Sequence, residues 1–208
     1  QTGWTMAIDA VSYPFSLHYN DAGTPISVIY PDGDALTTDL TSQGWPVGAT
    51  ETLNGVQTTL LSSVSYTGTN GAAQEPTSAL LANGVYTASY SYDGMARPTS
   101  LSTALTSGGT VLFAQSRGYD NVGNVTSVNS TLPAGTDNQV FCYDELNRLT
   151  WAGSTGTPSC GTSLTPGTLT SAAYTASYAY DVHNRLTTGP AGVYTYGDSS
   201  HRDAVTST

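Results

Sequence analysis

An eight-residue segment that occurs twice constrains the fold more than any other feature of the sequence. Residues 86–93 and residues 174–181 differ at a single position. Apolar or aromatic residues alternate with small ones, which is the period-2 pattern of a half-buried strand. In the second copy, Asp181-Val182-His183-Asn184 fits a type I turn, because Asp accepts a backbone hydrogen bond two residues on and Asn tolerates the left-handed conformation. The segment predicts a strand over 174–180, a turn, and a second strand from Arg185.

The Tyr-Asp pair at the end of this segment occurs four times, and similar residues follow it each time. Three of the copies place a residue that enters the left-handed region cheaply four positions after the Tyr. The first copy has Ala96 there, and Gly94 offers another place for its turn. We assign structural roles in the repeat to Tyr92, Asp93 and Arg97; Tyr119, Asp120 and Gly123; Tyr143, Asp144, Asn147 and Arg148; and Tyr180, Asp181, Asn184 and Arg185.

Composition and turn signals also favour an all-β chain. Thr and Tyr, which favour strands, are frequent, and 22 Gly residues supply turns. The Asn-Gly pairs at 54–55 and 83–84 are strong hairpin signals, since both central residues of a type I′ turn need a positive φ. They predict hairpins of 49–53 with 56–66 and of 77–82 with 85–92; a short helix over 76–82 is the alternative.

The segment before residue 77 reads as divergent repeats, and 77–208 as clear ones, of a single β domain spanning 1–208. We expect strands broken by turns there, with Pro14 marking an edge or a bulge. The expected strands are 11–19, 26–30 and 35–40; the expected turns and connections are 20–23, 31–34, 41–48 and 67–76. After the last repeat we expect a strand over 193–196, a loop at 197–202 and a final segment at 203–208.

The charge inventory excludes several classes of function. The formal net charge is −10, which argues against nucleic-acid partners and anionic membranes. All five basic residues are Arg, so chemistry that requires a Lys side chain is excluded. No apolar run reaches the roughly 18 residues of a membrane span.

The two cysteines, Cys142 and Cys160, predict a disulfide and an oxidising compartment. Two buried free thiols are the alternative. A metal site is not expected, because neither cysteine has a second Cys or His at ligand spacing.

We expect no catalytic site and no cofactor. His18, His183 and His201 are isolated, and the repeated Asp residues fit turn capping better than acid–base chemistry. The segment 32–34 supplies two carboxylates, too few on its own for Ca²⁺. Asn124 and Asn129 begin glycosylation sequons.

At the Tyr-Asp copies the chain resembles the Rhs/YD-repeat family. Residues 30–33 and 194–205 also look like segments of that family. The resemblance implies antiparallel hairpin repeats that form a twisted, spiralling sheet. In toxin complexes, Rhs proteins and teneurins, such sheets form a hollow shell around a cargo or support adhesion.

The function we predict is a non-catalytic, secreted or cell-surface structural module that builds a β wall. It would be part of a Rhs/YD shell, joined to flanking repeats of a longer chain, or the protomer of a filament joined through sheet edges. The alternative is an adhesin or carbohydrate-binding module that presents exposed Tyr and Trp side chains to a glycan.

Overall fold

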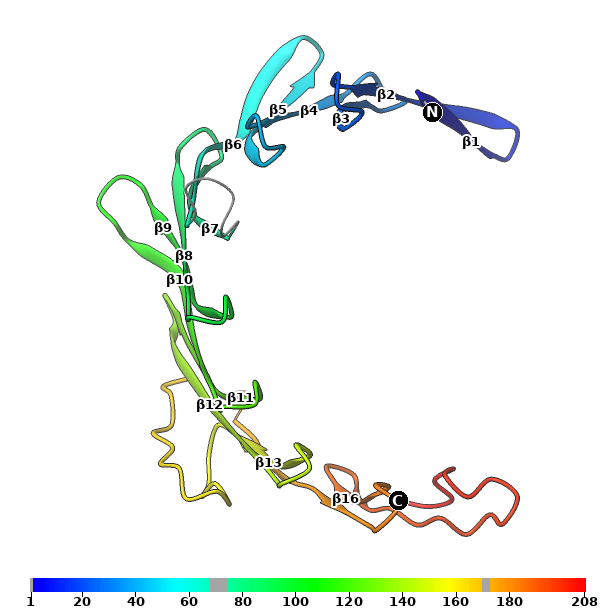
Figure 1. The fold of residues 1–208 in the computed structure, drawn as a ribbon, viewed down its shortest axis with the longest axis vertical. Helices are drawn as coiled ribbons and strands as arrows, with labels where there is room; N and C mark the ends of the chain where they lie inside the picture. The colour runs from blue at the N-terminus through cyan, green and yellow to red at the C-terminus, as the bar shows by residue number, and fades with distance from the viewer. Residues whose placement is uncertain (1, 68–74, 170–172) are drawn as a thin grey trace. The chain divides into compact units, whose positions relative to one another are not determined.

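Strands, turns and loops make up the described part of the chain, which comprises residues 2–67, 75–169 and 173–208 of a computed structural model (Figure 1). Fourteen strands form one antiparallel sheet in which the strand order is the sequence order. The predicted all-β class is therefore confirmed. The strands are β1 (Gly3–Ile8), β2 (Val11–Tyr19), β3 (Pro25–Ile29), β4 (Ala35–Leu40), β5 (Pro46–Leu53), β6 (Val56–Tyr66), β7 (Pro76–Leu81), β8 (Tyr86–Tyr92), β9 (Pro98–Leu105), β10 (Val111–Tyr119), β11 (Val125–Leu132), β12 (Gly135–Tyr143), β13 (Leu149–Gly153) and β14 (Thr175–Ser177).

A second sheet of three short strands follows, formed by β15 (Ala179–Tyr180), β16 (Leu186–Gly189) and β17 (Gly192–Val193). The expected continuous strand over 174–180 is therefore wrong. The N–H of Tyr178 still donates to the carbonyl of Thr150, whereas Ala179 and Tyr180 pair with β16. The chain thus changes sheets at Tyr178.

The chain divides into two compact units, residues 1–112 and 113–208. The single domain expected over 1–208 stays a prediction. In the first unit, the strands expected at 11–19 and 35–40 are β2 and β4, and the strand expected at 26–30 is β3, one residue earlier. Most of the connection expected at 67–76 lies outside the described residues.

The first predicted hairpin has the expected two-residue turn. Leu53 pairs with Val56, and Asn54 and Gly55 have φ values of 53° and 77°, as a type I′ turn requires. The second hairpin is present as well, so the helix alternative is wrong. Its connection is four residues long, because Leu81 pairs with Tyr86. The reason is that the N–H groups of the first two connecting residues bond back to β6.

Pro14 occupies a position where a missing N–H costs nothing. It lies inside β2 and pairs with Thr5 of β1, but β3 pairs with β2 only from Ser16 onward. At Pro14 the strand therefore has a neighbour on one side only, which is the edge position that the sequence allowed.

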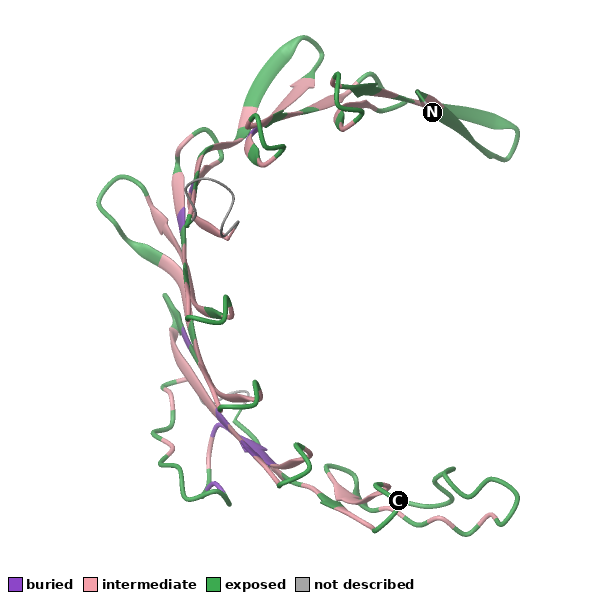
Figure 2. Ribbon diagram, in the orientation of Figure 1, coloured by how far each residue is buried: buried purple, intermediate pink, exposed green. Residues whose placement is uncertain are grey.

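Buried apolar residues are few, as in a sheet that is one layer thick. In the first unit, Ala79 and Ala88 are buried and lie opposite each other on β7 and β8. In the second unit, Val140, Cys142 and Trp151 form a small core on β12 and β13 (Figure 2). In each unit, the buried apolar residues therefore lie on two neighbouring strands.

The described part of the excursion that follows β13, residues 154–169, packs on the small core of the second unit. Leu164 contacts the core, and the N–H of Leu169 donates to the carbonyl of Thr136 on β12. Gly167 lies so close to this carbonyl that a Cβ at that position would clash with backbone. A region whose sequence predicts a polar loop therefore covers the buried core residues of the unit.

The chain end has less strand than expected. Only β17 and one isolated bridge between Thr195 and Ser207 take the place of the strand predicted at 193–196.

Candidate functional site: the tyrosine–aspartate loops

The loop that begins at Asp144 shows how the repeat is built. The N–H of Asp144 donates to the carbonyl of Arg148 at 2.9 Å, and the N–H of Asn147 donates to the carbonyl of Asp144 at 3.0 Å. Asp144 Oδ1 accepts hydrogen bonds from the N–H groups of Leu146 and Arg148, at 2.9 and 3.0 Å. The loop closes because Asn147 takes a left-handed conformation, with φ of 60°.

The other three predicted loops have the same two backbone bonds and the same aspartate cap. They begin at Asp93, Asp120 and Asp181. Their left-handed position is occupied by Ala96 (φ 60°), Gly123 (φ 103°) and Asn184 (φ 64°). The expectation that Gly94 offers another place for the first turn is wrong, because Ala96 itself adopts the left-handed conformation.

Three further loops near the N-terminus are copies of this loop; the sequence analysis missed two of them, whereas the third begins in the family-like segment 30–33. They begin at Asn20, Tyr30 and Thr41 and close with the same backbone bonds, three and four residues on. The Asn20 and Thr41 side chains accept the same two N–H bonds as the aspartates do. The missed signal is a Gly three residues after each first residue, since Gly reaches positive φ without a Cβ penalty.

Tyrosines that end a strand before a loop tie one repeat to the previous one in several places. The hydroxyl of Tyr143 donates to the carbonyl of Val125 at 2.9 Å, and that of Tyr180 donates to the carbonyl of Leu149 at 3.0 Å. In each case the acceptor is the first residue of the strand that follows the preceding loop. The same bond recurs from Tyr66 to Pro46, Tyr92 to Pro76 and Tyr196 to Leu186.

Arg148, at the end of its loop, makes three kinds of contact. Arg148 Nε donates to Asp144 Oδ2 at 2.7 Å, and the guanidinium lies 4.6 Å from the ring centre of Tyr180 in the next repeat. Its Nη1 donates to Asn184 Oδ1 in the next loop at 2.7 Å. Arg148 therefore links two neighbouring loops directly, besides stabilising its own.

Other loops use the same links. Arg185 pairs with Asp181, lies 4.6 Å from the ring centre of Tyr196, and donates to the carbonyl of Arg202. Arg97 pairs with Asp93 at 2.6 Å. Asn124 takes the place of the arginine in its loop and donates to both Asp120 and Asn147.

These contacts keep the loop carboxylates ionised. The side-chain hydrogen bond from Arg148 lowers the pKa of Asp144, and the backbone hydrogen bond from Arg97 lowers that of Asp93. For Asp181, desolvation raises the pKa, but the hydrogen bonds from the Arg185 backbone and side chain outweigh it and lower the pKa to about 2. A carboxyl group with a lowered pKa cannot donate a proton at neutral pH and is a weak base, so the geometry favours capping over acid–base chemistry.

The three histidines lie on separate elements. His18 is on β2, the N–H of His183 donates to Asp181 Oδ1, and His201 Nδ1 is 2.9 Å from Asp198 Oδ2. Within residues 2–67, 75–169 and 173–208, no three His, Cys, Asp or Glu side chains gather as a metal site. In the first sequon, the side-chain amide of Asn124 donates hydrogen bonds to two loop residues. In the second sequon, Asn129 is exposed on β11.

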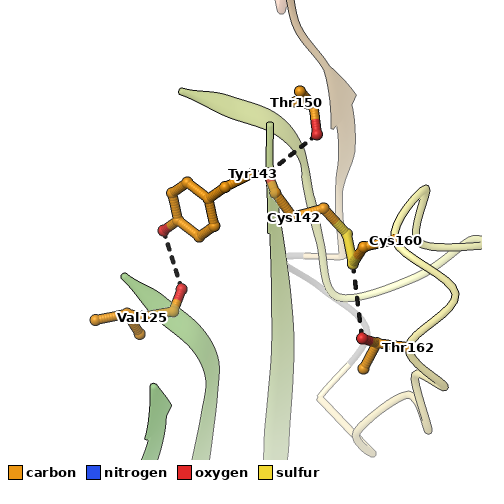
Figure 3. Close-up of a disulfide and its surroundings, with 6 residues drawn as sticks. All are labelled: Val125, Cys142, Tyr143, Thr150, Cys160 and Thr162. Atoms are coloured by element: carbon orange, nitrogen blue, oxygen red, sulfur yellow. Dashed lines mark hydrogen bonds between the residues drawn. A yellow bond between two sulfur atoms is a disulfide. The ribbon is translucent and has the colours of Figure 1, made fainter. Parts of the chain in front are cut away.

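A disulfide joins Cys142 of β12 to Cys160 of the excursion, as the sequence predicts (Figure 3). The two Cα atoms are 5.5 Å apart. The neighbouring Tyr143 makes the hydroxyl bond to Val125 that ties its repeat to the previous one. The bridge therefore fixes the excursion beside one of the links between repeats.

Solved structures with a similar fold come from Tc toxins. A crystal structure of TcdB2-TccC3 superposes with a TM-score of 0.67 at 21% identity over 89% of the chain. The Photorhabdus luminescens Tc holotoxin pore with a TccC3 mutation matches with a TM-score of 0.65 at 20% identity over 88% of the chain. This chain has the YD-repeat fold.

The likeness extends over one part of those toxin chains. A second crystal structure, of TcdB2-TccC3-TEV, matches 90% of this chain with a TM-score of 0.65 at 20% identity. This chain spans about a tenth of the length of the chains that it matches. No protein-family model and no curated protein matches it. Within the described residues, there is no helix with the length and apolarity to cross a membrane.

Proposed function

We propose that the chain is a segment of the wall of a larger YD-repeat shell, with a structural and non-catalytic role. The observation that supports this most is its match to about a tenth of the length of the Tc toxin chains. A wall needs repeats that hold one another in a fixed register. The tyrosine hydroxyl bonds provide this within each unit, and in the second unit the Arg148 link between loops adds to it.

The open edge at β1 is where flanking repeats would continue the wall. Among the described strands, β1 pairs with β2 alone, and its side chains Trp4, Met6 and Ile8 are 41–52% exposed. An edge strand with unpaired backbone groups is a template for another strand. In a longer chain this strand comes from the preceding repeat; in a filament it comes from a second copy.

The site of action that we propose is outside the cytosol. The disulfide between Cys142 and Cys160 supports this, since such bonds persist mainly in oxidising compartments. The exposed aromatic side chain of Trp4 is the observation that favours adhesion as a second candidate.

The register of β1 provides a test of the wall. The bond from the N–H of Leu17 to the carbonyl of Thr2 marks that pair as hydrogen-bonded. Since bonded pairs alternate along an antiparallel ladder, the N–H groups of Thr5 and Ala7 point away from β2, and that of Met6 points toward it.

Hydrogen exchange should therefore separate the two kinds of amide. In the 208-residue chain alone, we expect Thr5 and Ala7 to exchange fast and Met6 to exchange slowly. In the native full-length protein, all three should be protected, and electron microscopy should show a closed shell. Unprotected Thr5 and Ala7 in the native protein would contradict a continued wall, and filaments of copies would favour self-assembly instead.

A further inference from the structure

An open pocket of about 580 Å³ lies in the first unit, between β2 and the loop that follows β3. Tyr13, Phe15 and Tyr30 supply aromatic rings to its lining, and Asp32 and Asp34 supply carboxylates. None of the lining residues is basic. The pocket therefore combines aromatic surface with negative charge.

Asp34 has a carboxylate oxygen that lacks a donor. Its backbone is fixed, since its N–H donates to Asp32 Oδ1 at 3.1 Å and its carbonyl accepts from the N–H of Tyr30 at 2.8 Å. Asp34 Oδ1 is nevertheless buried and makes no hydrogen bond within the described part of the chain. A buried carboxylate oxygen without a donor is costly, and a cation bound beside the Asp34 carboxylate would offset part of that cost.

The aromatic rings of the pocket are held in place by one another. Phe15 meets Tyr30 edge-on at 5.9 Å between ring centres and stacks on Trp4 at 4.7 Å. Tyr13 and Tyr30 are each 38% exposed. Exposed aromatic faces attract cations through the ring quadrupole, most strongly where water is partly excluded.

The same chain shows what a carboxylate and a ring can hold together. Arg148 is bonded to Asp144 at 2.7 Å while its guanidinium lies 4.6 Å from the ring centre of Tyr180. Asp34 stands at the loop position that Arg148 has in its own loop, four residues after the first. The Tyr30 loop thus offers rings and carboxylates at a place where it supplies no cation of its own.

We propose that this pocket binds a guanidinium or ammonium group of another molecule. The cation must come from outside, because the chain has no Lys and none of its five Arg residues lines the pocket. Asp34 accepts the N–H bond, and Tyr13 and Tyr30 present ring surface to the charge. This binding goes beyond the proposed wall and does not depend on it.

The test is calorimetric titration of the 208-residue chain with N-acetyl-argininamide. We expect saturable binding, and at least about tenfold weaker binding of N-acetyl-citrullinamide, which has the same shape without the charge. Asp34→Asn should weaken binding about tenfold. Asp21→Asn, an equal change of charge in the neighbouring loop, should change affinity less than about twofold. Spermidine and an Arg-containing peptide, as further arms, distinguish a free polyamine from a protein side chain.

Several results would overturn the proposal. They are an absence of saturation, equal binding of the citrulline compound, equal losses in the two Asp variants, and saturable binding of a neutral oligosaccharide that Asp34→Asn leaves intact. Thermal unfolding of the free Asp34→Asn protein gives an independent readout. Because the variant removes an unpaired buried charge, its Tm should equal or exceed that of the parent chain. A clear fall in Tm would assign Asp34 a structural partner and refute the proposal.

Discussion

Ala96 is the repeat residue whose backbone conformation fits its side chain least, so replacing it should stabilise the protein. Its φ is 60°, a value that costs a residue with a Cβ roughly 1–2 kcal/mol. Ala96→Gly removes this cost but adds freedom to the unfolded chain, worth roughly 0.5–1 kcal/mol. We expect a net gain of about 0.5–1 kcal/mol in the free energy of unfolding. Ala96→Asn should also stabilise, because Asn147 and Asn184 hold this position in other loops.

The chain contains a matched control for this substitution. Ala22 is exposed, lies in the first unit like Ala96, and is placed one position earlier in its own loop, without a positive φ. Ala22→Gly should therefore only raise the conformational entropy of the unfolded chain, which lowers the free energy of unfolding by about 0.5–1 kcal/mol. The two Ala→Gly variants should move stability in opposite directions.

Urea unfolding at fixed pH, followed by circular dichroism, measures both changes. With an unchanged m value, a shift of the midpoint reports stability alone. In a calorimeter, 1 kcal/mol corresponds to roughly 2–4 °C for a chain of this size. If Ala96→Gly destabilises as much as Ala22→Gly does, the left-handed conformation at Ala96 carries no strain and the reasoning is refuted.

Three other changes test the links of the repeat. Tyr180→Phe should lower stability by about 1 kcal/mol in urea unfolding, because it removes the hydroxyl bond to Leu149 but keeps the ring. Cys160→Ala should cost about 3 kcal/mol in oxidised protein, since it opens the loop closed with Cys142. Acid should destabilise the protein as pH falls from about 4 to about 2, because Asp181 has a pKa of about 2 when folded and near 3.8 when unfolded.

Each of these changes has its own control. Tyr178→Phe alters a tyrosine outside the loop positions and should change stability little, so equal losses in the two Phe variants would contradict a specific hydroxyl bond. Reductant should destabilise the parent chain and leave Cys160→Ala unaffected; an effect on both would point away from the disulfide. The stability that Asp181 provides is complete above its unfolded pKa and is lost as pH falls through the folded one. A Tm that stays constant from pH 5 to pH 2 would show that the carboxylate bonds are not stabilising.

Much of the fold can be read from local sequence because its contacts are local. The strand β2 and the turn after Leu53 follow from alternation and from Asn-Gly. The role of Asp144 follows from its place at the head of a turn. In each case the residues that decide the structure lie within one hairpin.

Two kinds of feature are not predicted from the sequence: loop copies whose first residue is not Asp, and contacts between residues that are distant in sequence. The Asn20 and Thr41 loops were not recognised as copies, because their first residues share hydrogen-bonding capacity with Asp rather than identity. The bond from Tyr180 to Leu149 joins residues 31 positions apart. The cover over Trp151 comes from a polar excursion that carries no strand pattern. Sequence spacing alone indicates neither of the last two contacts, whereas the Gly three residues after Asn20 and Thr41 is a signal that spacing does contain.

The agreement between strand order and sequence order in the large sheet has a consequence for biosynthesis. Each strand from β2 to β13 pairs with the strands made just before and just after it. A chain of this kind can fold progressively as it emerges from a ribosome or a secretion channel, with each new hairpin added to an edge that already exists. The excursion before β14 is the exception, because β13 must wait for residues 154–174 to be made before its partner arrives. The disulfide between Cys142 and Cys160 can form before the excursion is complete, and it then holds residue 160 beside β12 while the rest of the excursion and β14 follow.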